Sequence, residues 1–127
     1  MKTPDDLPAK RQYVNLLFDF YGSLLTQKQA ECFTLRYIDD YSLAEIAQEL
    51  NITPQAAVDF LKRALSSLER YEEHLSLVQK HIKRQSLSED LTIKLNTFEQ
   101  TILNGSATDI TKSMQKIKTI ISDFSHI

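Results

Sequence analysis

The feature that most constrains the fold is a pair of helix-start signals separated by only a few residues in the middle of the chain. Ser42, with Glu45 three residues later, has the pattern of a capping box, and the apolar residues of 43–50 recur at the spacing of one helical face. Thr53 followed by Pro54 is a second start signal, because proline fixes the first-turn backbone angle and loses no needed donor there. Two capped helices this close predict a helix-turn-helix, and a packed helical hairpin is the plainer alternative.

The composition favours an all-α fold. A chain of 127 residues with 2 Gly and 3 Pro has too few turn-formers for many short strands, so we expect one domain or two small helical subdomains. The single cysteine cannot form a disulfide within the chain, and no 18-residue apolar run or basic-apolar leader is present. We therefore expect a cytoplasmic protein without membrane insertion.

Apolar periodicity predicts the helices that flank the helix-turn-helix. The segment Tyr13–Tyr21 carries an unusually wide apolar stripe, and Gly22 after it is suited to close a helix in a left-handed conformation. Thr26 is the expected N-cap of a second helix, which ends before a turn at Asp39-Asp40-Tyr41. The helix that starts at Pro54 has no glycine or proline to stop it, so we expect it to continue to about Arg84.

The last third of the chain predicts a helical hairpin. Ser86 with Glu89 resembles another capping box, Asn104-Gly105 is a stop signal, and Thr108 or Asp109 is expected to cap the final helix. The predicted organisation is a helix-turn-helix domain with a long extended helix over 1–84. The hairpin over 85–127 then packs on that domain or on a second copy of the chain.

Charge is distributed unevenly along the chain, although the net charge is only −2. Residues 13–61 carry seven acids against Lys28 and Arg36, whereas residues 62–84 carry six basic residues against three acids. A basic segment can contact phosphate groups, and a solvated helix face is the alternative explanation.

No arrangement typical of catalysis is present. The two glycines stand alone, so no phosphate-binding loop is predicted, and the histidines are too scattered to chelate a metal ion. Asp39-Asp40 fits backbone capping in a turn better than acid–base chemistry, and Cys32 fits a small core residue. We expect a protein that is not an enzyme and has no cofactor or metal.

One set of motifs resembles the YlxM family of bacterial helix-turn-helix proteins. The resemblance covers residues 13–84 and rests most on the string Asn15-Leu-Leu-Phe-Asp-Phe-Tyr-Gly22, and its other motifs are Leu25-Thr26, Lys28-Gln29, Asp39–Leu43, Glu45–Ala47, Gln55-Ala56 and Lys62-Arg63. It implies an all-helical fold related to the DNA-binding region four of sigma factors, with a long recognition helix and no catalysis. It also implies an accessory or regulatory role in the signal recognition particle (SRP) pathway, with the SRP GTPase and the small SRP RNA as partners.

The start of the helix from Pro54 departs from sigma-like DNA readers, which carry Arg, Lys or Ser at the exposed positions. Here Asp59 would repel phosphates, and Val58 and Phe60 cannot donate hydrogen bonds. A DNA-binding transcriptional regulator is therefore the alternative to the SRP role. The candidate nucleic-acid contacts are Thr53, Gln55, Lys62, Arg63, Lys80, Lys83 and Arg84.

Excess apolar residues predict a protein interface. If the core positions of this helix are Ala57, Leu61, Ala64 and Leu68, then Phe60 and Tyr71 are surplus apolar surface, which favours a protein partner or a homodimer. The candidate interface residues are Tyr13, Leu16, Phe20, Phe60, Tyr71, Leu75, Val78 and Ile82.

Overall fold

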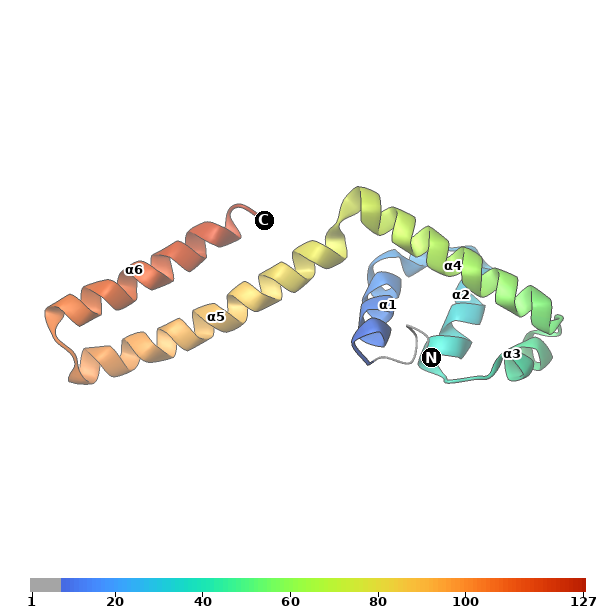
Figure 1. The fold of residues 1–127 in the computed structure, drawn as a ribbon, viewed down its shortest axis with the longest axis horizontal. Helices are drawn as coiled ribbons and strands as arrows, with labels where there is room; N and C mark the ends of the chain where they lie inside the picture. Colours follow the sequence, from blue (N-terminus) through green and yellow to red (C-terminus); the bar gives the residue numbers. More distant parts are fainter. Residues whose placement is uncertain (1–7) are drawn as a thin grey trace. The chain divides into compact units, whose positions relative to one another are not determined.

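A computed structural model describes residues 8–127, and every regular element in that range is helical (Figure 1). The all-α expectation is therefore confirmed. The chain forms two compact units, of which the first extends to Val78 and the second comprises Gln79–Ile127. This division lies earlier in the chain than the expected one at residue 84.

The first helix, α1 (Pro8–Tyr21), begins before the expected start at Tyr13 and is followed by the short 3-10 helix η2 (Gly22–Leu24). Gly22 does not adopt a left-handed conformation, so the predicted left-handed helix end is wrong. A Cβ atom at Gly22 would lie 2.8 Å from the ring of Phe18, which stacks on Phe33 with ring centroids 4.4 Å apart. Glycine is required here because an aromatic ring approaches the backbone closely.

The second helix, α2 (Gln27–Phe33), has the predicted capping box, in which the Thr26 side chain accepts from the Gln29 amide. Its last turn passes directly into a π-helix, η3 (Thr34–Ile38), which the sequence pattern did not predict. The expected turn follows, with Asp40 at a positive φ of 59°.

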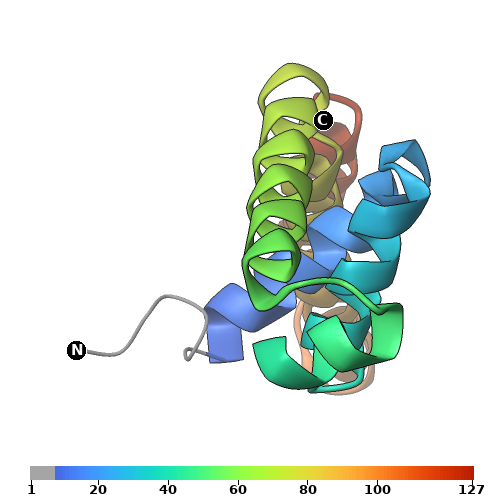
Figure 2. The same cartoon turned by 90° about the vertical axis from the view of Figure 1, so that its right-hand side faces the viewer.

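The helix-turn-helix is present as predicted. Ser42 caps α3 (Leu43–Leu50), Asn51 ends it at a left-handed φ of 54°, and the Thr53 side chain caps α4 (Pro54–Leu75). Figure 2 looks onto the turn that joins α3 to the start of α4. The four predicted core positions of α4 are all buried: Ala57, Leu61, Ala64 and Leu68. Ala57, Leu61 and Leu68 belong to one core cluster with apolar residues of α1, α2 and α3, namely Val14, Leu17, Tyr21, Cys32, Phe33 and Ile46.

The long helix predicted from Pro54 to about Arg84 is wrong, because Ser76 adopts a left-handed φ of 54° and separates α4 from α5 (Leu77–Asn104). The Tyr21 hydroxyl accepts from the Leu77 amide at 3.0 Å and donates to Glu72 Oε1 at 2.6 Å. The same carboxylate oxygen accepts from the amide of Val78 at 3.0 Å. A hydroxyl group distant in sequence and a carboxylate from the end of α4 thus satisfy amides that open α5, and Val78 is buried in the core.

The helix start predicted at Ser86 is also wrong, because α5 runs through that residue and its amides already have partners within the helix. The predicted end at Asn104-Gly105 is confirmed. The last helix, α6 (Ala107–Phe124), is capped by Ser106 rather than by Thr108 or Asp109. Asp109 instead occupies the third helical position, where its carboxylate accepts from the Ser106 amide at 3.3 Å. Within the second unit, α5 and α6 form the predicted antiparallel hairpin (Figure 1).

Candidate nucleic-acid interface

A basic groove runs along one face of α4. It has a volume of about 440 Å³ and is lined by Gln29, Lys62, Arg63, Ser66, Ser67 and Arg70. These α4 residues share a face because each has neighbours in the set three or four positions along the helix. The lining holds three cationic side chains and no carboxylate, which is the chemistry that binds a phosphate group.

Two of the candidate nucleic-acid contacts, Lys62 and Arg63, lie in this groove and are exposed. Thr53 and Gln55 do not line it. The Thr53 hydroxyl accepts from the Ala56 amide at 3.0 Å, so its polar atom is used in capping α4, whereas Gln55 is exposed at the first turn.

Sequence reasoning missed Arg70 and the two serines of the groove. A signal was available: Arg70 lies seven residues after Arg63 and eight after Lys62, so the three cations share one helical face. Gln29 could not be found this way, because it comes from α2 and reaches the groove only through the packing of α2 against α4.

The start of α4 offers different chemistry. A smaller hollow of about 160 Å³ is lined by Ala56, Asp59, Phe60 and Arg63. Its carboxylate opposes phosphate binding, and its apolar side chains cannot read base edges by hydrogen bonding. The positively charged surface of α4 therefore lies beyond its first two turns.

The remaining basic candidates, Lys80, Lys83 and Arg84, are exposed on α5 and belong to the second unit. They form a basic surface on a different helix from the α4 groove. No carboxylate lies between Ser76 and Arg84 in the chain.

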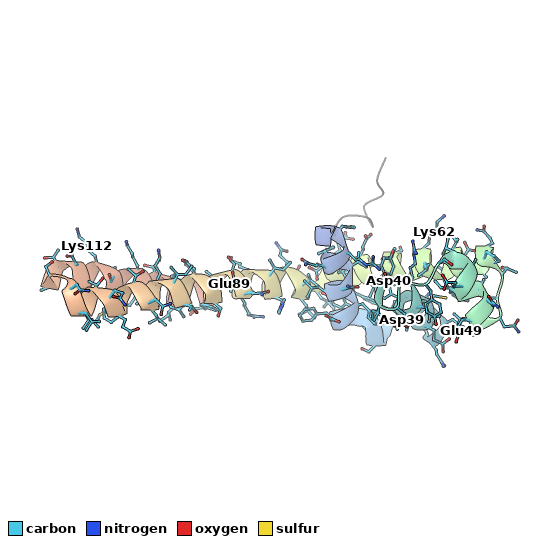
Figure 3. The ribbon with its side chains drawn as sticks, turned by 90° about the horizontal axis from the view of Figure 1, so that it is seen from below. Asp39, Asp40, Glu49, Lys62, Glu89 and Lys112 are labelled. Carbon is cyan, nitrogen blue, oxygen red and sulfur yellow. The ribbon has the colours of Figure 1, made fainter. Side chains whose placement is uncertain are left out.

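Acidic residues occupy another side of the first unit. In Figure 3, Lys62 projects from the edge of the unit opposite to Glu49 and Asp39. On the acidic side, residues of α2, η3 and α3 line a shallow, mainly apolar pocket of about 370 Å³. Its lining residues are Gln27, Ala30, Glu31, Thr34, Leu35, Glu49 and Leu50. Asp40 is engaged elsewhere, in an ion pair with Arg11.

The candidate interface residues divide into three groups. Val78 has no exposed surface and belongs to the core of its own chain, so it cannot contribute to an exposed face. Phe20, Leu75 and Ile82 are exposed. The other four pack partly against the core and present only part of their side chains: Tyr13, Leu16, Phe60 and Tyr71.

Titratable groups with shifted pKa values lie in the core rather than at the groove. Burial raises the pKa of the Tyr21 phenol, and its hydrogen bond to Glu72 acts in the same direction. Burial also raises the pKa of the Cys32 thiol, as does the charge of Glu31, so the thiol is held in its neutral form inside the core. Among residues 8–127, no three His, Cys, Asp or Glu side chains are grouped so as to hold a metal ion. None of the helices described is both long and apolar enough to cross a membrane.

Comparison with known proteins identifies close relatives. Residues 8–110 match the model of a family described as "Putative helix-turn-helix protein, YlxM / p13 like". This match extends through α5 into the start of α6.

Several individual proteins are similar over more than half of this chain. The UPF0122 protein YofM of Lactococcus lactis is 47% identical over 93 residues, which are 73% of this chain and 84% of the relative. The UPF0122 protein lin1916 of Listeria innocua is 46% identical over 68% of this chain and 78% of its own length. The UPF0122 protein TTE1463 of Caldanaerobacter subterraneus is 56% identical over 54% of this chain and 59% of its own length.

Proposed function

The chain belongs to the YlxM / p13-like family of helix-turn-helix proteins, and on this premise we propose that it is a non-enzymatic accessory protein of the SRP pathway that binds the small SRP RNA through the basic groove of α4. This role places it in the cytoplasm. The observation that carries the proposal is the groove itself, in which three cations and two serine hydroxyls line one helix face without a carboxylate.

The distribution of charge on α4 favours a structured RNA over sequence-specific duplex DNA. Double-stranded RNA is recognised mainly by shape and by contacts to its backbone, which require cations and hydroxyls rather than base-reading side chains. The groove supplies both groups, whereas the first turns of α4 carry Asp59 and Phe60 where a DNA reader needs donors.

The acidic side of the first unit supports a protein partner. Its pocket is mainly apolar and is bordered by Glu31 and Glu49, so it is complementary to an apolar side chain that has basic neighbours. We assign this surface to the SRP GTPase. A protein with RNA-binding and protein-binding sides can regulate the particle without catalysis of its own.

The alternative function is transcriptional regulation by a domain related to region four of sigma factors. Gln55 favours it, because this amide is exposed in the first turn of the second helix of the helix-turn-helix, where adenine can be read. This alternative requires a sequence preference. A selection from random DNA duplexes at physiological salt would return a motif if it were correct.

The test is a fluorescence-anisotropy titration of the protein against labelled SRP RNA and a duplex DNA control, at two salt concentrations, with and without the SRP GTPase. We expect preferential binding to the RNA. Equal or stronger binding to the duplex would support the regulator, and no binding to either nucleic acid would refute the proposed RNA contact.

Variants locate the RNA-binding surface. Lys62→Glu with Arg70→Glu should weaken RNA binding and lower the slope of log affinity against log salt, by roughly 0.7–0.9 for each phosphate that is no longer neutralised. Lys112→Glu with Lys116→Glu makes the same charge change at exposed positions of α6 and is the control. Charge reversal at Lys80, Lys83 and Arg84 tests the basic start of α5. Equal effects of the groove and control variants would show that only total charge matters.

A further inference from the structure

The second unit has very little core of its own. Of residues 79–127, only Ile117 and Ile120 are buried, and both belong to α6. Two helices side by side cannot enclose the apolar side chains that lie between them, so a hairpin of this length needs a further layer. The position of the uncovered side chains shows where that layer would pack.

The uncovered apolar side chains form a stripe on one side of the hairpin. On α5, Leu95 and Ile102 are seven residues apart and 48% and 53% exposed. On α6, Met114 and Ile121 are also seven residues apart and 42% and 53% exposed. We call these four residues the hairpin stripe.

The two halves of the stripe lie on the same side of the hairpin. Each stripe residue follows by four positions a residue that is at least half-buried where α5 and α6 face each other, and these are Leu91, Phe98, Ile110 and Ile117. Because α5 and α6 are antiparallel, the same offset on both helices turns both pairs toward the same side. Near the loop that connects the helices, Ser113 on the opposite side donates a hydrogen bond to Thr101 at 3.5 Å.

Opposite charges lie beside the stripe at matching positions. Glu99 is four residues after Leu95 on α5, and Lys118 is four residues after Met114 on α6, and both side chains are exposed. When an α5 helix packs beside an α6 helix of another hairpin, an acid on one meets a base on the other. Charges that flank an apolar seam in this way select the partner of a helix.

We propose that a second copy of this chain covers the hairpin stripe, so that two hairpins form a four-helix bundle. A surface that carries an apolar stripe between an acidic and a basic edge is complementary to itself after a two-fold rotation that brings α5 against α6 of the partner. None of the four stripe residues is among the interface candidates identified from the sequence. Of those candidates, only Ile82 lies in the second unit.

The test is the mass of the full-length protein in solution, measured by sedimentation equilibrium over a range of micromolar concentrations. The wild type should have twice the 14.6 kDa mass of one chain. Ile102→Glu with Ile121→Glu should weaken the dimer on the order of a hundredfold or more, because it places charges in the buried seam of both copies. Ile93→Glu with Leu103→Glu is the matched control, because these residues are 59% and 71% exposed outside the stripe, and it should leave the mass unchanged.

A charge exchange tests the partner more specifically. Glu99→Lys or Lys118→Glu alone should weaken the dimer by about threefold to tenfold, and the double exchange should restore it. Circular dichroism should show the helix content of the wild type in the Ile93→Glu with Leu103→Glu control and in the double exchange, because these variants keep the second copy on the hairpin stripe. A wild-type mass of one chain, equal effects of stripe and control variants, or no restoration by the double exchange would each overturn the proposal.

Discussion

Removal of one hydroxyl group should destabilise the first unit. In Tyr21→Phe, the ring that fills the core is retained, but Glu72 loses a donor at 2.6 Å and the Leu77 amide loses an acceptor at 3.0 Å. Tyr21 is only 1% exposed, so water cannot replace the hydroxyl without rearrangement. The break between α4 and α5 therefore loses two of the interactions that hold it.

The magnitude follows from the type of each bond. A hydrogen bond to a charged group contributes about 1.5–3 kcal/mol, and a neutral one about 0.5–1.5 kcal/mol. Leu77 is 38% exposed and Glu72 keeps the Val78 amide as a donor, so part of each loss is recovered. We expect the free energy of unfolding to fall by about 2 kcal/mol.

The assay can report the first unit alone, because all five tyrosines lie between residues 13 and 71. Tyrosine fluorescence during urea unfolding therefore follows this unit. Tyr41→Phe is the control, since no hydrogen bond of its hydroxyl is found among residues 8–127. Glu72→Gln keeps an acceptor oxygen, and the double variant with Tyr21→Phe should lose less than the sum of the single losses. A loss for Tyr21→Phe within about 0.5 kcal/mol of the control would refute the reasoning.

Three further predictions concern the same unit. Burial raises the pKa of Tyr21, so its stabilising neutral form is fully present below pH 10, and the free energy of unfolding should fall as pH rises above that value. Denaturant titrations at several pH values should show a smaller fall in Tyr21→Phe than in the wild type. Gly22→Ala should destabilise by about 1–3 kcal/mol, because the new Cβ lies 2.8 Å from the Phe18 ring, and thermal unfolding measures it. Thr53→Ala should lower the free energy of unfolding by about 1 kcal/mol, because it removes the side-chain cap of α4. Urea unfolding measures this loss, and the control is Thr119→Ala, which removes an exposed hydroxyl that is hydrogen-bonded within α6.

Local signals predicted the helix-turn-helix well. Capping at Thr26, Ser42 and Thr53 depends on side chains that reach amides only three residues away, so the sequence contains the whole interaction. The four core positions of α4 were likewise predictable, because helical spacing alone places them on one face.

The candidate site was predicted only in part. Lys62 and Arg63 were identified from their sequence, and Arg70 shares their helical spacing, but the contribution of Gln29 requires the packing of α2 on α4. The hairpin itself was predicted, whereas the side on which the hairpin stripe remains uncovered depends on how α5 and α6 face each other.

The sequence by itself determined the starts of α2, α3 and α4, and with them the helix-turn-helix, as well as the end of α5, because capping and helical periodicity act over a few residues. The tertiary structure decided the break at Ser76. No glycine or proline marks this position. The amide of Val78 donates to Glu72, whereas the amide of Leu77 donates to Tyr21, which lies more than fifty residues away in the chain. The sequence pattern is equally compatible with one helix or two, and these hydrogen bonds, together with the burial of Val78 in the same core cluster as Tyr21, select two.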